Sequence, residues 1–154
     1  MSLKKYQSKR KFFGKNRTNE PKPKLEKQNK KQKIFVVHKH HASHLHWDLR
    51  LEMNGVLKSW AVPKEPPLKK GIKRLAIQVE DHPLEYANFK GTIPEGHYGA
   101  GKVEIWDKGN YELKNKDEKK IEFILNGKKL KGNFVLVKTS YGKKPEKSWL
   151  WFKI

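Results

Sequence analysis

The sequence contains no cysteine, so disulfide scaffolds, cysteine-ligated zinc fingers and thiol nucleophiles are excluded. It also lacks the apolar core of a signal peptide near its beginning and any apolar run long enough to span a bilayer. Hydrophobic residues form only 35% of the chain, which is below the average for globular proteins. These absences predict a cytoplasmic protein that makes no membrane contact and is associated with the nucleoid if its partner is DNA.

Acidic residues are also scarce, since 36 Lys and Arg face only 16 Asp and Glu and leave a formal net charge of +20. Residues 1–33 contain 13 of these cations against Glu20 and Glu26, so this stretch alone carries +11. A charge of this size favours a polyanionic partner, because each phosphate contact with Lys or Arg releases condensed counterions. We therefore predict a basic N-terminal arm over residues 1–33, a folded domain over residues 34–154, nucleic acid as the partner and a monomer.

Long helical periods are missing beyond residue 33, where short alternating runs of apolar and polar residues are separated by turn signals. Alternation with a period of two is typical of half-buried strands. Asn54-Gly55 and Asn126-Gly127 are predicted hairpin turns, and residues 107–110 (DKGN) a further tight turn. The pattern predicts an all-β fold, a compact closed or nearly closed antiparallel barrel of about eight strands with short helical turns only. The expected strands are 34–38, 45–52, 56–62, 74–80, 102–107, 111–113, 120–125, 133–138 and 149–154.

Five of the seven histidines lie within residues 36–52. Alternate residues of a strand share a face, so His46, Asp48 and Arg50 are expected to point the same way. His46 and Asp48 offer two metal ligands from one strand, and His40 on the preceding segment offers a third. Two imidazoles and one carboxylate leave open coordination positions and suit Mn²⁺, Fe²⁺ or Zn²⁺. Spacing alone does not choose between this set and the other histidines nearby, which are His38, His41 and His44.

Two further stretches carry candidate functional groups. His82 follows a predicted strand in VEDHPLEY and precedes Pro83, where an imidazole can act as an acid, a base or a phosphate donor. Lys64 follows the strand that ends at SWAVP, where an ammonium group can contact phosphate.

The stretch from Gly96 to Lys102 matches the G-x-x-x-x-G-K pattern of a nucleotide-binding P-loop. However, Val103 stands where Ser or Thr would bind magnesium, and the following residues alternate as a strand rather than opening a helix. We therefore reject the P-loop and expect these glycines to shape a tight approach between strands.

Three long motifs resemble, in order and spacing, the 3′-phosphoesterase domain of bacterial DNA ligase D, a family that also occurs as free-standing small proteins. They are KHHASHLHWDLRLEMNGVLKSWAVPKEP, RLAIQVEDHPLEYANFKGTIPEGHYGAG and KSWLWFKI. The resemblance covers essentially the whole chain and implies a compact β-barrel whose interior polar groove holds the site. It implies removal of 3′-phosphates and 3′-terminal ribonucleosides, which leaves 3′-hydroxyl ends that a DNA ligase or polymerase of an end-joining repair system can use. It also implies a divalent metal, Mn²⁺ by preference, with Zn²⁺ or Co²⁺ as alternatives.

Carried over position by position, the resemblance implies that His40, His46 and Asp48 bind the metal. The other histidines of that stretch are then surface or groove residues. Catalytic or phosphate-contacting roles are implied for Arg50, His82 and Tyr86, with Lys64 and Arg74 as supporting cations. Substrate-binding roles are implied for Arg10, Glu20 and Glu52, the last as a residue that orients others.

The basic arm departs from the family pattern at one point. Family members carry an Arg-Asp pair where this chain has Arg10-Lys11, while Glu20 matches the family's acidic residue further on. The resemblance implies that the arm is partly ordered over the active site.

Two other functions use the same residues. A non-haem iron oxygenase would take His46, Asp48 and a distant histidine, His82 or His97, as its ligands. Arg50 beside these ligands suits an oxyanion better than oxygen activation. A non-catalytic basic nucleic-acid-binding protein would have incidental histidines, and a chelator would change none of its activities. We favour the metal-dependent phosphoesterase, in which His82 acts either as a general acid or as a stabiliser of the transition state.

Overall fold

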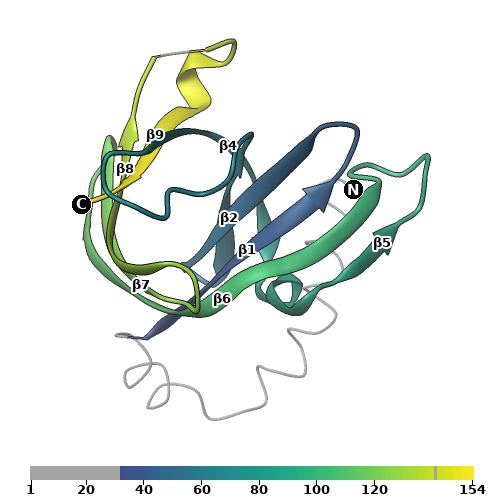
Figure 1. Ribbon diagram of the computed structural model, residues 1–154, viewed down its shortest axis with the longest axis horizontal. Coiled ribbons are helices and arrows are strands. Elements are labelled where there is room, and N and C mark those ends of the chain that lie inside the picture. Colours follow the sequence, from purple (N-terminus) through teal and green to yellow (C-terminus); the bar gives the residue numbers. More distant parts are fainter. Residues whose placement is uncertain (1–31, 141) are drawn as a thin grey trace.

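Alternating runs of the sequence form nine strands of one antiparallel sheet in the computed structural model, which describes residues 32–140 and 142–154 (Figure 1). The strands are β1 (Lys33–His41), β2 (Leu45–Met53), β3 (Val56–Val62), β4 (Lys73–Pro83), β5 (Gly91–Ile93), β6 (Gly101–Lys116), β7 (Lys120–Asn126), β8 (Lys131–Lys138) and β9 (Ser148–Lys153). The two 3₁₀ turns are η1 (Leu84–Asn88) and η2 (Pro145–Lys147). In the part of the chain so described, no helix is long and apolar enough to cross a membrane.

The sheet closes on itself because β1 pairs with both β2 and β6. Its strand order is β1-β2-β3-β4-β9-β8-β7-β6-β5, and the additional β1–β6 ladder joins the two sides into an eight-stranded barrel. The 16-residue strand β6 makes this closure possible, since it runs beside β1 and then continues to β7 (Figure 1). The predicted all-β, closed antiparallel barrel with short helical turns is confirmed.

The predicted turn at residues 107–110 was wrong, because these residues continue β6 and join two runs that the alternation had separated. Gly109 passes so close to β7 that a Cβ there would lie 2.2 Å from the Asn126 carbonyl oxygen. The carboxylate of Asp107 instead accepts hydrogen bonds from the amides of Lys128 and Leu130, both at 2.8 Å, and holds the β7–β8 connection. The short strand β5 was not predicted.

The two predicted Asn-Gly turns have different outcomes. Asn54 and Gly55 have φ values of 52° and 79°, the conformation of a two-residue hairpin, and they join β2 to β3 as expected. Asn126 ends β7, and the connection to β8 runs through residues 127–130 rather than through two residues.

The barrel interior is apolar and closely filled. Large side chains point inward from every part of the barrel, among them Phe35, Leu49, Trp60, Trp151 and Tyr111. The alternate residues of β1 to β4 point outward, where η1 and β5 cover them and a second small cluster forms around Val36, Leu57 and Ala87. The polar groove therefore lies on the outer face of the sheet and not in the interior, because aromatic side chains occupy the interior.

Of the predicted arm over residues 1–33, only Gln32 and Lys33 fall within the described residues, and Lys33 begins β1. Arg10, Lys11 and Glu20 lie outside the described residues, as does the expected folding of the arm over the site.

Candidate active site

Strand register brings the candidate residues of β1 and β2 together. His40 pairs with His46 and His38 with Asp48, so all four side chains share the outer face of the barrel. His40, His46 and Asp48 border a cleft of about 220 Å³ between this face and residues 84–100. The cleft is lined by His40, Ala42, His46, Asp48, Arg50, Ala61, Val79, Glu80, His82, Tyr86, Ile93, Tyr98 and Gly99.

His40, His46 and Asp48 form the one group among the described residues that could hold a metal ion, with ligand atoms within 4.8 Å of one another. Asp48 Oδ2 lies 3.3 Å from His46 Nε2 and 3.8 Å from His40 Nδ1. Ligands of one Zn²⁺-sized ion lie about 3 to 3.5 Å apart, given bonds of about 2.1 Å. The His46–Asp48 spacing falls in this range, and a small inward movement of His40 would bring all three ligand atoms onto one divalent ion.

The second nitrogen of each imidazole is held by a backbone carbonyl. His40 Nε2 hydrogen-bonds the carbonyl of Gly99 at 2.8 Å, and His46 Nδ1 hydrogen-bonds that of His44 at 3.0 Å. These anchors aim His40 Nδ1 and His46 Nε2 at Asp48, which is the support that metal-binding histidines usually have. The donor set thus fits a metal both in its chemistry and in its orientation.

Arg50 lines the cleft and is buried, with only 4% of its surface exposed. Its Nε donates to His38 Nδ1 at 3.0 Å, its Nη1 to Ser59 Oγ at 2.9 Å, and its Nη2 to Asp48 Oδ2 at 3.3 Å. Ser59 in turn donates to the carbonyl of Leu57. Three different acceptors therefore hold the guanidinium in one orientation before any substrate arrives.

Aromatic rings cover the guanidinium from the side of η1. The Arg50 Cζ lies 5.0 Å from the centre of the Tyr86 ring, a cation–π distance. The Tyr86 ring also contacts the ring of His82 at 4.9 Å and stacks on Phe89 at 4.9 Å. His82 Nδ1 hydrogen-bonds the carbonyl of Glu80 at 3.0 Å and lies 3.2 Å from Arg50 Nη1.

Burial and charge move the pKa values of these groups in opposite directions. Burial, aided by Arg50, lowers the pKa of both His38 and His82 to about 3, so both imidazoles are neutral at neutral pH. Burial would raise the pKa of Asp48, but Arg50 and then His46 hold it below its ordinary value. Burial would lower the pKa of His46, but its hydrogen bond to Asp48 and the charge of Asp48 raise it. Burial and the neighbouring His46 lower the pKa of His40.

Three of the predicted residues lie elsewhere in the fold. Lys64 is exposed and Arg74 Nε donates to the carbonyl of Glu65, and neither lines the cleft. Glu52 accepts a hydrogen bond from the Ile34 amide at 2.9 Å, further along the outer face from the metal group. The structure thus brings together His40, His46, Asp48, Arg50, His82 and Tyr86.

Residues to which the resemblance gave no catalytic or metal-binding role also take part here: Glu80 lines the cleft, and His38 and Ser59 hydrogen-bond Arg50 without lining it. His38 is fully buried, accepts a hydrogen bond from Arg50 and donates from Nε2 to the carbonyl of Phe89 at 3.0 Å, so it is not a surface residue. His41 and His44 are exposed. No sequence motif pointed to Ser59 or Glu80. For His38, the only indication was that it lies two residues from His40 on one strand, and alternate residues of a strand share a face.

The glycines of the rejected P-loop pattern shape a close approach, as expected. A Cβ on Gly101, whose φ is 127°, would lie 2.1 Å from the His41 carbonyl oxygen. This approach sets residues 96–100 beside the cleft, where the Gly99 carbonyl meets His40.

A family model of the DNA ligase D 3′-phosphoesterase domain matches residues 38–138, which contain every candidate residue of this cleft. The chain belongs to this phosphoesterase family. Three relatives illustrate the membership, each a multifunctional non-homologous end joining protein LigD. The Pseudomonas aeruginosa protein is 52% identical over 69% of the chain, the Mycobacterium bovis protein 46% over 81%, and the Mycolicibacterium smegmatis protein 44% over 88%.

These matches cover 13%, 17% and 18% of the three LigD proteins, so the chain spans less than a fifth of their length. The rest of those proteins has no counterpart in this alignment. The similarity therefore concerns the phosphoesterase domain, which includes the cleft and its strands. It does not extend to the activities of a whole LigD protein.

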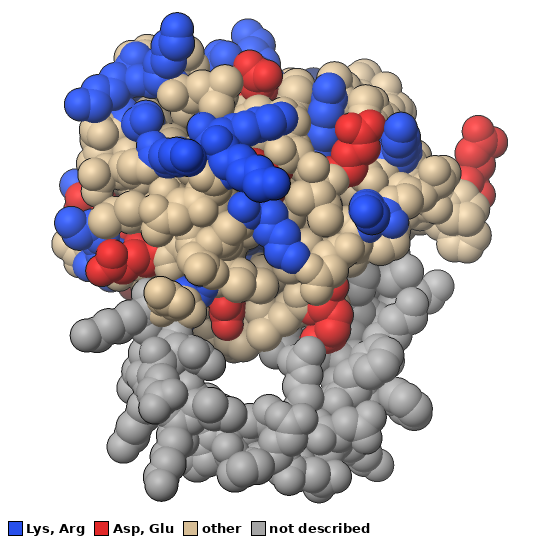
Figure 2. All heavy atoms as spheres, turned by 60° about the horizontal axis from the view of Figure 1, so that its bottom comes forward, with Lys and Arg blue, Asp and Glu red and all other residues tan. Residues whose placement is uncertain are grey.

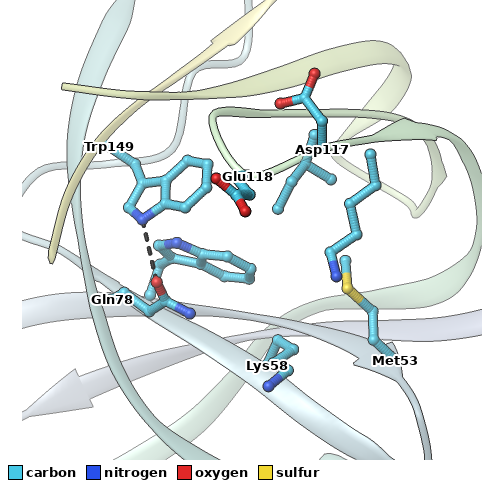
Figure 3. Close-up of a pocket in the computed structure, with 9 residues that line it drawn as sticks. Met53, Lys58, Gln78, Asp117, Glu118 and Trp149 are labelled. Carbon is cyan, nitrogen blue, oxygen red and sulfur yellow. Dashed lines mark hydrogen bonds between the residues drawn. The ribbon is translucent and has the colours of Figure 1, made fainter.

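A larger cavity of about 410 Å³ lies at one end of the barrel (Figure 3). Trp60 and Trp149 meet edge to face at 6.1 Å in its wall, and Trp149 Nε1 donates to Gln78 Oε1 at 3.2 Å. Figure 3 shows Met53 and Lys58 on one side of this cavity and Asp117 and Glu118 on the other. None of the three metal-capable side chains borders it.

Proposed function

We propose that this phosphoesterase is a divalent-metal enzyme, using Mn²⁺ by preference, that removes 3′-phosphates and 3′-terminal ribonucleosides from nucleic-acid ends. The observation that carries the proposal is the placement of the His40–His46–Asp48 group against the buried Arg50 in one cleft. A metal beside a guanidinium suits a phosphate ester, because both groups bind anionic oxygens.

The metal would be held by His40 Nδ1, His46 Nε2 and a carboxylate oxygen of Asp48. A bound divalent ion supplies a Lewis acid for a phosphate oxygen and lowers the pKa of a bound water. The protein holds these three donors in the cleft and orients the two imidazoles by hydrogen bonds to the carbonyls of Gly99 and His44.

Arg50 would bind non-bridging phosphate oxygens. A guanidinium has five N–H donors, and acceptors on His38, Ser59 and Asp48 each take one. The two remaining donors belong to Nη1, which also lies 3.2 Å from His82 Nδ1, and to Nη2. Because the three acceptors orient the group in advance, little reorganisation is needed when negative charge develops on the phosphoryl oxygens.

His82 and Tyr86 would complete the phosphate site. The neutral His82 must gain a proton before it can donate from both ring nitrogens, and an incoming dianionic phosphate favours that charged form. His82 would then hydrogen-bond the phosphate, either to protonate the leaving oxygen or to stabilise the transition state. A general acid makes kcat fall as pH rises through the pKa of His82 in the complex, whereas a stabilising role changes affinity first.

The basic surface would hold the nucleic-acid strand by its backbone. Figure 2 shows a group of Lys and Arg side chains across one face of the described part of the molecule. Binding by such a surface is salt-dependent and insensitive to sequence. In the proposal Lys64 and Arg74 would be supporting cations for the phosphate, Arg10 and Glu20 would bind substrate, and Glu52 would orient other residues. The substrates would be DNA or RNA–DNA 3′ ends, passed on to the ligase and polymerase of an end-joining system by a monomer.

The test uses two primer-templates, one with a 3′-phosphate and one with a single 3′-terminal ribonucleotide. Each is incubated with the protein and Mn²⁺, with and without EDTA, beside Asp48→Ala and the control Glu118→Ala at the other cavity. We expect conversion to 3′-hydroxyl ends that EDTA and Asp48→Ala abolish and Glu118→Ala preserves. Activity that survives EDTA, or two unchanged ends, would overturn the proposal. If only the ribonucleotide end is processed, the phosphate-removing step is absent, and Lys11, which stands where the family has Asp, is the first residue to test.

A further inference from the structure

One aromatic side chain stands apart from the others in its exposure. In residues 32–140 and 142–154, Tyr98 is the one aromatic residue whose side chain is exposed, with 65% of its surface accessible. Every other described Trp, Tyr and Phe is buried or half-buried in the barrel or under η1. Single exposed apolar residues are ordinary, so the position of Tyr98 decides whether its exposure has a meaning.

Tyr98 lies in the wall of the cleft that contains the metal group and Arg50. Its chain neighbour Gly99 accepts the hydrogen bond from His40 Nε2 at 2.8 Å, so the backbone beside Tyr98 is tied to a metal ligand. Gly96 and Gly99 have φ values of 86° and 77°, a left-handed conformation that favours glycine and turns the chain on both sides of Tyr98. The ring is thus held a short, defined distance from the site by its own backbone.

The hydroxyl end of the ring is held as well. Tyr98 donates a hydrogen bond to the carboxylate of Glu80, which also borders the cleft. Burial of the hydroxyl and the Glu80 hydrogen bond and charge raise the pKa of Tyr98, so the phenol keeps its proton at neutral pH. An exposed ring that is anchored at both ends loses little conformational entropy when another flat group packs on it.

The charged groups of the cleft have no surface for a nucleobase. Asp48, Arg50 and the two metal-binding imidazoles serve a metal and a phosphate, and the Tyr86 ring is engaged with His82 and Phe89. A nucleic-acid end presents a flat base within one nucleotide of its terminal phosphate. Stacking of a base on an aromatic side chain is worth about 1–3 kcal/mol and tolerates any base.

We propose that Tyr98 forms a nucleoside subsite, on which the base of the 3′-terminal nucleotide stacks while its phosphate is held at Arg50. This inference rests on the proposed function, since it names the part of the substrate that the phosphate-binding groups leave unbound. It makes the enzyme prefer an end that carries a base over an abasic end, without any preference for base sequence.

The test is a double-mutant cycle that combines one substitution in the protein with one change in the substrate. Wild-type protein and Tyr98→Ala are titrated, in EDTA to prevent turnover, with duplexes whose 3′-phosphate end carries either a base or an abasic analogue. Stacking predicts that Tyr98→Ala weakens binding of the base-bearing end by about 5- to 150-fold and leaves the abasic end unchanged. Tyr98→Phe, which keeps the ring but loses the Glu80 bond, should retain most of the affinity.

A direct readout uses 2-aminopurine as the terminal base, whose fluorescence falls when it stacks on an aromatic ring. We expect quenching with wild type and Tyr98→Phe and none with Tyr98→Ala. Ile154→Ala is the control, because it removes an exposed apolar side chain, 47% accessible, at the far end of the chain. Equal weakening of both ends by Tyr98→Ala, or no weakening of either, would overturn the subsite. If wild type processes 3′ ends in Mn²⁺ while the cycle shows no coupling, only the subsite fails.

Discussion

Two cavities lie on opposite faces of β3 and β4, and the smaller of them contains the candidate site. The barrel-end cavity has about 410 Å³ and the cleft about 220 Å³. The larger one is walled by Trp60, Trp149 and Met53, whereas the smaller one buries Asp48 and Arg50 with 5% and 4% of their surfaces exposed. A charged group is costly to bury without a partner. Buried charged groups with shifted pKa values therefore indicate a functional site better than the volume of a cavity does.

Consecutive residues of the same strand separate the two cavities. Ser59 turns outward and accepts a hydrogen bond from Arg50, while Trp60 turns inward to the barrel-end cavity. The two regions thus share a backbone and differ only in which side chains alternate onto each face. Variants in the two cavities can therefore be compared as matched pairs on one scaffold.

The largest expected effect is that of Arg50→Lys in the cleft. A lysine has one ammonium group and cannot meet His38, Ser59 and Asp48 while it also binds a phosphate. We expect kcat/KM for 3′-phosphate removal to fall by about 100-fold or more, the loss typical of a removed oxyanion donor. Lys116→Ala at the barrel-end cavity should leave kcat/KM unchanged. Comparable losses in both variants, with melting temperatures preserved, would show that the cavities act as one site.

A smaller effect is expected from His38, which accepts a hydrogen bond from Arg50 and is not one of the three candidate metal ligands. His38→Ala removes the acceptor of the Arg50 Nε–H and leaves a buried donor unpaired, at a cost of about 1–3 kcal/mol. We expect kcat to fall by about 10-fold, with part of the activity restored in His38→Gln, whose amide oxygen can accept the same bond. An equal loss in both variants would mean that His38 acts through its ring and not by positioning Arg50.

The buried histidines of the cleft also predict how stability depends on pH. Folding lowers the pKa of His38 and His82 from 6.5 to about 3, so the unfolded chain binds more protons than the folded one between these values. Their contribution to stability is therefore complete above about pH 6.5 and is lost as the pH falls toward 3. Each histidine should lower the free energy of unfolding by about 1 kcal/mol between pH 7 and 5.5.

Urea denaturation in EDTA at several pH values measures this dependence. His38→Gln should flatten the curve by the share of one histidine, whereas Lys116→Ala at the other cavity should leave its slope intact. An unchanged slope in His38→Gln would contradict the assignment of a proton-linked stability to this residue.

The smallest effect on activity is expected at the barrel-end cavity itself. Gln78→Ala removes the acceptor of the Trp149 indole N–H and should lower the free energy of unfolding by about 1 kcal/mol. Its kcat/KM should stay within about twofold of wild type, because Gln78 points away from the cleft. Thermal melting and steady-state kinetics on the same preparation separate the two results. Lost activity without lost stability would assign the barrel-end cavity a part in the reaction.

Most of the barrel could be predicted from the alternation of side chains, because a strand's two faces follow from local backbone geometry. The same alternation predicted that His46, Asp48 and Arg50 share a face, and the structure brings them together. The single strand across residues 107–110 could not be predicted, since DKGN has the composition of a turn. Its path depends on Gly109 passing close to Asn126 and on Asp107 holding the next connection, both of which are contacts distant in sequence.

The sequence by itself determined most of the strands, the shared face of the candidate ligands and the membership of a phosphoesterase family, because each of these follows from local patterns or long motifs. Only the tertiary structure decided which face of the sheet became the filled interior and which became the cleft. It also decided that His38 and Ser59 hold Arg50, from 12 and 9 residues away, and that Tyr98 borders the metal group. The physical reason is closure: until β1 pairs with β6, alternation defines two faces of a sheet but neither an inside nor an outside.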